Sequence, residues 1–272
     1  LMGSRGIFRC DTKEEVFTHY ADTMNATGKD YCLLEEFIEG TMLGCEAMLS
    51  KGKLLYCLPN NIENYPAHVP TPIGHSVPYK KQDILGEEVQ KQVLLAIQAL
   101  GMDNCPVNCD LMEKDGKIYV IEITGRAGGN CLPEMVGIYY GIDYYEAIVR
   151  LAMDMQAEEL FQDQKNRFQN AAQRKCGERP ENTDGNLNRV TPNLSHILTS
   201  DRDGILKAIH NDNEASPDLL DLSFNVEPGE EIRHYENGRD RLGQVIICGE
   251  TLDACEQRLN EVLSKLNIEF IS

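Results

Sequence analysis

The chain has 272 residues, of which 42% are hydrophobic and 26% charged, so it can form one large or two modest cores and is not disordered throughout. A formal net charge of −18 and a pI near 4.7 exclude general adsorption to nucleic acid or anionic membranes, because that affinity needs clustered Lys and Arg. No apolar run approaches the ~20 residues of a membrane helix, and no secretory signal pattern opens the chain, so we expect a cytoplasmic protein.

The first sixty residues predict one helix followed by three strands. A capping pattern at residues 11–15 precedes apolar residues at helical spacing, which indicates a helix. Residues 32–38 read as a strand. Two further strands, residues 43–49 and 53–58, flank a turn at residues 50–52.

The next segment predicts a loop, a helix and a hairpin. Residues 59–78 contain several prolines and no helical or strand period, so we expect a structured loop that crosses a surface or a site. Residues 87–100 carry apolar side chains on one helical face and end at Gly101. Two strands, residues 108–112 and 118–123, then form a compact hairpin.

The remaining sequence predicts a second lobe. A helix is expected over residues 144–156, after which residues 157–188 turn polar and predict a solvent-exposed connection. We therefore expect three parts, namely residues 1–156, the connection at 157–188, and a small C-terminal α/β lobe at 189–272. The elements expected in that lobe are strands at 196–199, 219–226 and 244–248 and a capped helix at 251–266.

The ten cysteines are scattered singly, without the clustering typical of disulfide-stapled miniproteins. We interpret them as reduced core thiols, including Cys45, Cys57, Cys248 and Cys255. Cys105 and Cys109 are the closest pair, but no second Cys or His pair follows at zinc-site spacing, so zinc is not expected there.

The predicted hairpin contains two acids in apolar strands, where burial without a partner would be costly. Asp110 and Glu122 lie on one face if the loop between the strands has three or five residues, and on opposite faces if the turn has two. We predict the odd-numbered loop. Two carboxylates on one face suit Mg²⁺ (or Mn²⁺), whereas the alternative is an edge-strand acid that points to solvent.

The residues after Glu122 favour the interpretation of Asp110 and Glu122 as a metal site. Arg126 offers a fork of donors to a transferring phosphoryl group or to the oxyanion of acyl transfer. Backbone amides near Gly128 and Gly129 could bind a substrate carboxylate.

These motifs resemble the ATP-grasp superfamily, in particular the branch of carbamoyl-phosphate synthase large-chain domains and L-amino-acid ligases. The resemblance covers roughly residues 1–150 and implies an ATP-grasp fold, of class α/β (α+β), with an antiparallel sheet and packed helices. It implies that Asp110, Glu122 and Thr124 hold metal, and that Arg126 is catalytic. The implied ATP-binding residues are those of a glycine loop (Gly3, Ser4, Arg5, Gly6) and of an adenine hinge (Glu35, Glu36, Phe37, Ile38).

Some positions depart from the family pattern. Thr124 stands where relatives usually have Asn, and Met42 stands where an acid usually holds the ribose, so ribose contact would fall to another residue such as Glu46. The Lys that precedes the glycine loop in relatives has no counterpart, and the resemblance implies an N-terminal domain upstream of Leu1 and a homo-oligomer.

The implied function is an ADP-forming, carbon–nitrogen bond-forming ligase that uses ATP and Mg²⁺ to activate a small carboxylate for attack by an amine, through an acyl phosphate. Two alternatives stay open: an enzyme similar to carbamoyl-phosphate synthase that uses bicarbonate, and a catalytically silent nucleotide-binding module. His75, Gly128 and Gly129 are the expected substrate contacts. For His75 the alternative is a loop histidine whose hydrogen bond goes to a neighbouring carbonyl.

Overall fold

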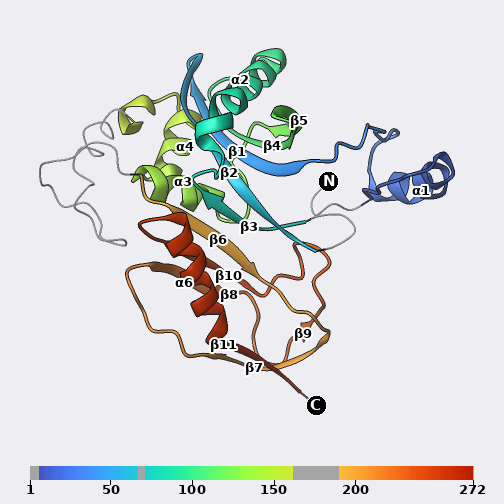
Figure 1. Cartoon of the computed structure of the whole chain (residues 1–272), viewed down its shortest axis with the longest axis vertical. Coiled ribbons are helices and arrows are strands. Elements are labelled where there is room, and N and C mark those ends of the chain that lie inside the picture. Colours follow the sequence, from blue (N-terminus) through green and yellow to red (C-terminus); the bar gives the residue numbers. More distant parts are fainter. Residues whose placement is uncertain (1–5, 67–70, 162–189, 272) are drawn as a thin grey trace, which may run out of the picture.

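The computed structural model describes residues 6–66, 71–161 and 190–271. Its main feature is an eight-stranded antiparallel sheet with strand order β5-β4-β1-β2-β3-β6-β10-β8 (Figure 1). The strands are β1 (Thr41–Ser50), β2 (Lys53–Tyr65), β3 (Thr71–Val77), β4 (Pro106–Lys114), β5 (Lys117–Thr124), β6 (Asn193–Leu198), β8 (Leu219–Phe224) and β10 (Gly243–Cys248). The predicted α+β class with a large antiparallel sheet is confirmed.

One face of the N-terminal half of the sheet is covered by a long helix, α2 (Gln82–Leu100). Its buried side chains, including Val89, Val93 and Ile97, pack on the odd-numbered residues of β1 and on apolar residues of β4. Gly101 ends the helix with a φ of +63°, a left-handed conformation that glycine adopts without strain. The predicted helix is confirmed and begins five residues earlier than its apolar pattern indicated.

The opposite face is covered by two shorter helices, α3 (Leu132–Tyr140) and α4 (Tyr144–Ala152). They bury Met135, Tyr144 and Leu151 against β1 and β2. Only part of this face is apolar, since polar side chains of β1, β2 and β4 occupy the area beside the two helices. The candidate site lies in that polar area.

The C-terminal lobe extends the same sheet. β3 pairs with β6, so the backbone hydrogen bonding passes from the N-terminal half into the lobe without a break. Helix α6 (Leu252–Ser264), capped by Thr251 as predicted, packs on β6 and β10. A second sheet, with order β11-β7-β9, completes the lobe, and its strands were not predicted: β7 (Gly204–Asn211), β9 (Glu231–Ile232) and β11 (Leu266–Phe270). Most of the predicted connection at 157–188 lies outside the described residues.

Two predictions of secondary structure are wrong. The loop expected at 59–78 is formed largely by β2 and β3, which are interior strands with polar residues facing the site, so no alternation of apolar and polar residues marks them. The strand expected at 32–38 is irregular, and Leu33 and Leu34 are each 76% exposed. Among the described residues this segment has no strand partner, and a strand needs one to satisfy its backbone.

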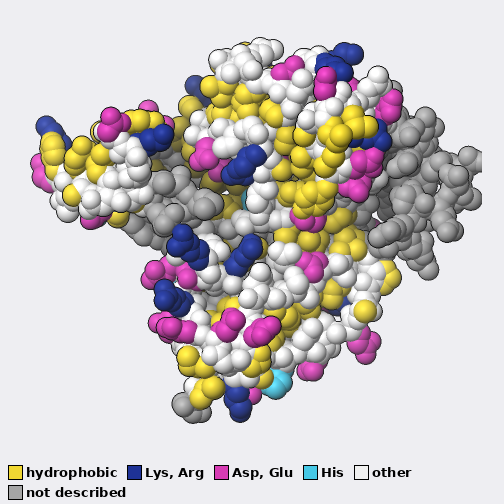
Figure 2. Space-filling model, turned by 180° about the vertical axis from the view of Figure 1, so that it is seen from behind, with side chains coloured by type: hydrophobic (Ala, Val, Ile, Leu, Met, Phe, Trp, Pro, Cys, Tyr) yellow, Lys and Arg dark blue, Asp and Glu magenta, His cyan; other side chains and the backbone are white. Residues whose placement is uncertain are grey.

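Helix α1 (Lys13–Ala26) projects away from the sheet (Figures 1 and 2). It begins as predicted, with a capping box in which Thr12 accepts the Glu15 amide and the Glu15 carboxylate accepts the Thr12 amide. None of its side chains is buried, and Phe17 is 71% exposed. Local capping, and not packing on the core, therefore defines this helix.

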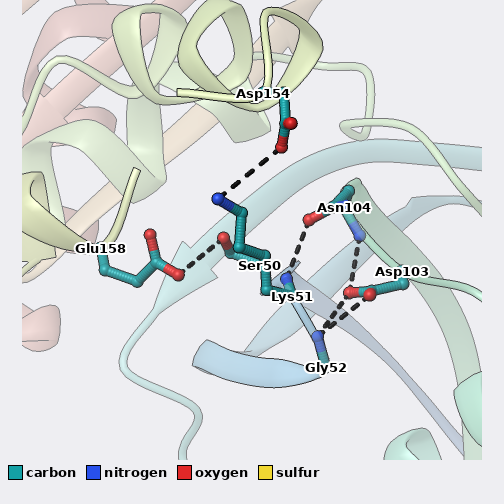
Figure 3. A network of polar contacts seen from close by, with 7 residues as sticks. All are labelled: Ser50, Lys51, Gly52, Asp103, Asn104, Asp154 and Glu158. Atoms are coloured by element: carbon teal, nitrogen blue, oxygen red, sulfur yellow. Dashed lines mark hydrogen bonds and ion pairs between the residues drawn. The ribbon is translucent and has the colours of Figure 1, made fainter. Parts of the chain in front are cut away.

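A polar network fixes the turn between β1 and β2 (Figure 3). The Lys51 amide donates to Asn104 Oδ1 at 2.8 Å, and the Gly52 amide donates to the Asp103 carboxylate at 2.9 Å. On the other side, Ser50 Oγ donates to Glu158 Oε1 at 2.8 Å. The turn is thereby tied to the residues that lead into β4, which supports the register between the strands that carry the site.

Cys45, Cys57 and Cys255 are free thiols, as predicted, whereas Cys248 is disulfide-bonded, so the prediction is wrong there. Within the described residues, every helix is too short or too polar to cross a membrane.

Candidate active site

The β4–β5 hairpin brings Asp110 and Glu122 opposite each other. The turn holds two residues, Asp115 and Gly116, both with positive φ (53° and 76°), so the predicted odd-numbered loop is wrong. The register then shifts between Asp110 and Leu111, so that Ile121 is an extra residue of β5. This β-bulge changes the pairing by one residue and restores the alignment that the odd loop was invoked to produce.

Asp110 lies between an acid and a glycine in neighbouring strands. Glu122 is opposite it on β5 and Gly44 is opposite it on β1. Burial raises the pKa of Asp110, the charge of Glu122 raises this pKa further, and the charge of Arg126 lowers it. Two carboxylates that face each other in this way favour binding of a cation.

Arg126 follows β5 directly and reaches the same group of acids. Its side chain is exposed, and Nη1 donates to the Ala127 carbonyl at 2.7 Å. Its charge lowers the pKa of both Asp110 and Glu46, which places the guanidinium within electrostatic range of both carboxyls. Among the described residues this is its one hydrogen bond, so most of its donors are open to a ligand.

Glu46 lies beneath the glycine turn and is fully buried. One carboxylate oxygen accepts from Asn108 Nδ2 at 2.7 Å, and the other accepts the Gly128 amide at 3.2 Å. The resemblance suggested Glu46 only for ribose contact, so its contact with the glycine turn was not predicted. The signal was present, because Glu46 is an acid within an apolar strand, the same pattern that identified Asp110.

His75 lies on β3, not in a loop, and is 7% exposed. Its Nδ1 donates to Asn60 Oδ1 at 3.0 Å, so its partner is a side chain and not a neighbouring carbonyl. Burial lowers the pKa of His75 to about 4. Asn60 pairs with Gly44 and its amide lies over that glycine, which is directly opposite Asp110. A row of polar groups thus crosses the sheet from β3 to β5.

Within the described residues, the predicted ATP-binding residues of the glycine loop and the adenine hinge are not brought to the acids. Gly6 packs against the end of α1, and Gly3, Ser4 and Arg5 lie outside the described residues. The expected adenine hinge belongs to the irregular segment before β1, where Glu35, Glu36 and Phe37 are exposed and Ile38 is partly buried. No contact in the described residues brings this hinge to the acids.

Thr124 and Gly129 are near the acids in different ways. Thr124 pairs with Asn108, and its hydroxyl donates to the Asn108 carbonyl at 3.4 Å, which leaves the oxygen lone pairs free. Gly129 is exposed and has open space around it. Both residues therefore remain available to a ligand.

The donor set fits a hard cation that is only partly ligated by protein. Across the described ranges, no three His, Cys, Asp or Glu side chains converge as a closed metal cage. Asp110 and Glu122 instead provide carboxylate oxygens on one face, and the third nearby acid, Glu46, is already used by two N–H donors. Mg²⁺ commonly binds one or two carboxylates and completes its shell with water and phosphate oxygens.

Comparisons with known proteins find one family model and several solved structures that are similar to this chain. Residues 196–270 match the model of a family described as L-amino acid ligase C-terminal domain 2. The structure is similar to that of phosphoribosylglycinamide synthetase from Anaerococcus prevotii, at 34% identity and a TM-score of 0.74 over 97% of this chain and 63% of the other. No curated protein matches the sequence.

Two more distant structures share the fold. An L-amino acid ligase from Bacillus licheniformis is 18% identical, with a TM-score of 0.65 over 87% of this chain and 53% of the other. A biotin carboxylase from Campylobacter jejuni, solved in complex with an ATP analogue, is 13% identical, with a TM-score of 0.64 over 99% and 56%. The chain therefore spans between 53% and 63% of the length of these three proteins.

Proposed function

We propose that this chain, which belongs to the ATP-grasp superfamily, forms the nucleotide-binding and catalytic part of a ligase that joins a small carboxylate to an amine at the expense of ATP. The observation that carries this proposal is the pairing of Asp110 with Glu122 beside Arg126. Two acids and an arginine on one sheet face are the groups that a metal–triphosphate complex needs.

The substrate class is supported by the relatives. One similar structure is named as a synthetase of phosphoribosylglycinamide, a glycine amide, and another as an L-amino acid ligase. We propose the same class for this chain, namely an amino acid or similar small carboxylate as the acceptor of the phosphoryl group.

The proposed reaction has two steps. A carboxylate oxygen of the acceptor attacks the γ-phosphate of ATP, the bond to the β-phosphate oxygen breaks, and ADP leaves. The amine then attacks the carbonyl carbon of the acyl phosphate, loses a proton and expels inorganic phosphate. Correct positioning and charge compensation account for most of the rate in such reactions.

Each residue has a separate task in this scheme. Asp110 and Glu122 would hold Mg²⁺, which supplies charge compensation for the triphosphate when bound. Arg126 stabilises the charge that develops on the transferred phosphoryl group and on the oxyanion of the second step. The amide of Gly129 orients the acceptor carboxylate, and neutral His75, whose Nδ1 donates to Asn60, offers Nε2 as a hydrogen-bond acceptor without adding charge.

Calorimetric titration tests the first half of the proposal. A non-hydrolysable ATP analogue is titrated into the chain with and without Mg²⁺, and into Asp110→Asn. We expect Mg²⁺-dependent binding to the native chain and at least about tenfold weaker binding to the variant, because it removes one of two metal-holding carboxylates. Equal binding by both proteins, or binding that ignores Mg²⁺, would contradict the assigned site.

ADP release tests the second half. The chain is mixed with ATP and Mg²⁺ and supplied with amino acids in pairs, or with bicarbonate and an amine. Stimulation by amino acids alone supports the proposed acceptor class. Stimulation by bicarbonate alone would replace it, and tight nucleotide binding without any ADP release would indicate a silent module.

A further inference from the structure

We propose that Glu46 is a positioning residue for this site: its carboxylate holds the Gly128 amide and the Asn108 side chain, and so fixes the turn that carries Arg126. The catalytic consequence rests on the function proposed above, whereas the contacts themselves do not. Glu46 touches no part of the expected reacting groups directly, and it acts through the turn.

The position of Glu46 in the sheet explains why it can do this. It lies at the middle of β1, opposite Asn108 on β4, and has no exposed surface. Asn108 in turn pairs with Thr124, the last residue of β5 before the turn. The carboxylate therefore sits under the point where β5 ends and the chain turns toward α3.

Both oxygens of Glu46 are used, and each has a different partner. Asn108 Nδ2 donates to one at 2.7 Å, and the Gly128 amide donates to the other at 3.2 Å. A carboxylate is an acceptor at both oxygens, so it can satisfy two N–H donors at once. A glutamine cannot, because its amide nitrogen would face one of those donors.

The turn fits closely over the carboxylate. A methyl group added at Gly128 would lie 2.6 Å from Glu46 Oε1 and 2.5 Å from Leu132 Cδ1. Only a residue without a side chain lets the backbone approach the acid this closely. The close contact between the turn and the sheet therefore requires both Gly128 and Glu46.

Burial and the charges of the site together set the charge state of Glu46. Burial raises the pKa of Glu46 to about 8 even though the Gly128 amide, the Asn108 side chain and the Arg126 charge each lower it, so the ionised form that accepts at both oxygens is complete above that pH. Asp110 raises it slightly. Burying an acid costs desolvation free energy, and the two hydrogen bonds of Glu46 offset part of this cost while they hold the turn in place.

Hydrogen exchange of the chain without nucleotide provides the direct test, because it needs no activity. Native protein is compared with Glu46→Gln, and the exchange of the Gly128 amide is followed. We expect exchange at Gly128, measured above pH 8 where Glu46 is ionised, to become about tenfold faster or more, since one N–H donor loses its charged acceptor. Unchanged exchange at Gly128 in a folded Glu46→Gln protein would overturn the proposal.

Another buried acid, on the β4–β5 hairpin, offers a control variant. Glu113, a largely buried acid on β4, accepts the Gly116 amide at 3.0 Å and Lys81 Nζ at 2.6 Å, at the turn end of the hairpin. Glu113→Gln should speed exchange at Gly116 and leave Gly128 unchanged. If both variants affect Gly128 equally, the effect is general loosening of the hairpin and the proposal fails.

Two additional measurements keep the inference separate from the proposed function. Glu46→Asp retains two acceptor oxygens on a shorter side chain, so Gly128 should exchange faster than in the native chain. If the Gln variant does not fold, unchanged exchange at Gly128 in Glu46→Asp overturns the proposal. If the native chain turns over ATP, Glu46→Gln should lower kcat about tenfold while the Kd of the nucleotide analogue changes less than twofold. If the native chain shows no turnover, the proposed function fails while the exchange result still decides the role of Glu46.

Discussion

Replacing Gly128 by alanine tests the close approach of the glycine turn to the sheet. The added methyl group would lie 2.5 Å from Leu132 Cδ1, 2.6 Å from Glu46 Oε1 and 3.0 Å from Asn108 Nδ2. Overpacking of this kind costs about 1–3 kcal/mol. The loss of glycine flexibility from the unfolded chain offsets about 0.4–1 kcal/mol. We therefore expect a net loss of roughly 0.5–2 kcal/mol in the free energy of unfolding.

Gly129→Ala is the matched control for this prediction, because a methyl group there meets nothing within 4 Å. Its stability should stay level or rise by up to about 1 kcal/mol, through the unfolded chain alone. Urea unfolding of both variants beside the native chain provides the measurement. If the two variants unfold with free energies within about 0.5 kcal/mol of each other, the close contact at Gly128 does not exist and the reasoning is refuted.

Three further predictions follow from the charges of the site. Arg126→Ala should cut turnover far more than it weakens nucleotide affinity, because its role is in the transition states; an equal loss of both in steady-state and binding assays would remove that role. Glu122→Gln should raise the Mg²⁺ concentration that gives half-maximal nucleotide binding about tenfold, and an unchanged titration curve would exclude Glu122 as a ligand. His75 has its pKa lowered by burial from 6.5 to about 4, so the unfolded chain binds the extra proton between these values and stability rises with pH through that window. Compared with His75→Gln, the native chain should lose up to roughly 3 kcal/mol as the pH falls from 6.5 to 4, and parallel curves for the two proteins would contradict the assignment.

The hairpin shows how far local sequence rules carry the prediction of the site. The two acids and the arginine were identified from residue type and order, and the structure brings them together. The reason given for their alignment was wrong, because Asp115 and Gly116 form a two-residue turn and the bulge at Ile121 supplies the shift. A bulge depends on pairing between strands, and no local pattern in the sequence announces it.

Glu46 and Asn60 were harder to recognise because their roles depend on register. Glu46 contacts Gly128, 82 residues later in the chain. Asn60 and Asp110 lie on either side of Gly44, in the two strands that neighbour β1. Such contacts depend on which strands are neighbours, and one sequence does not reveal that order.

Helix α4 shows a similar limit in the core. We predicted a helix in this region, but its inner face is formed by Tyr144, Ala147 and Leu151, while Tyr145 is 53% exposed and donates to Glu134. The helix carries apolar residues on more than one side, so periodicity alone does not decide which side packs on the sheet.

The continuous pairing of β3 with β6 has a consequence for dissecting the protein. If the chain were cut before residue 193, β3 would lose its neighbour and present a row of unsatisfied amides and carbonyls to solvent. Such an open edge recruits strands from other molecules, so a shortened product should self-associate. The C-terminal lobe thus also pairs with, and so protects, the edge of the strand that carries His75.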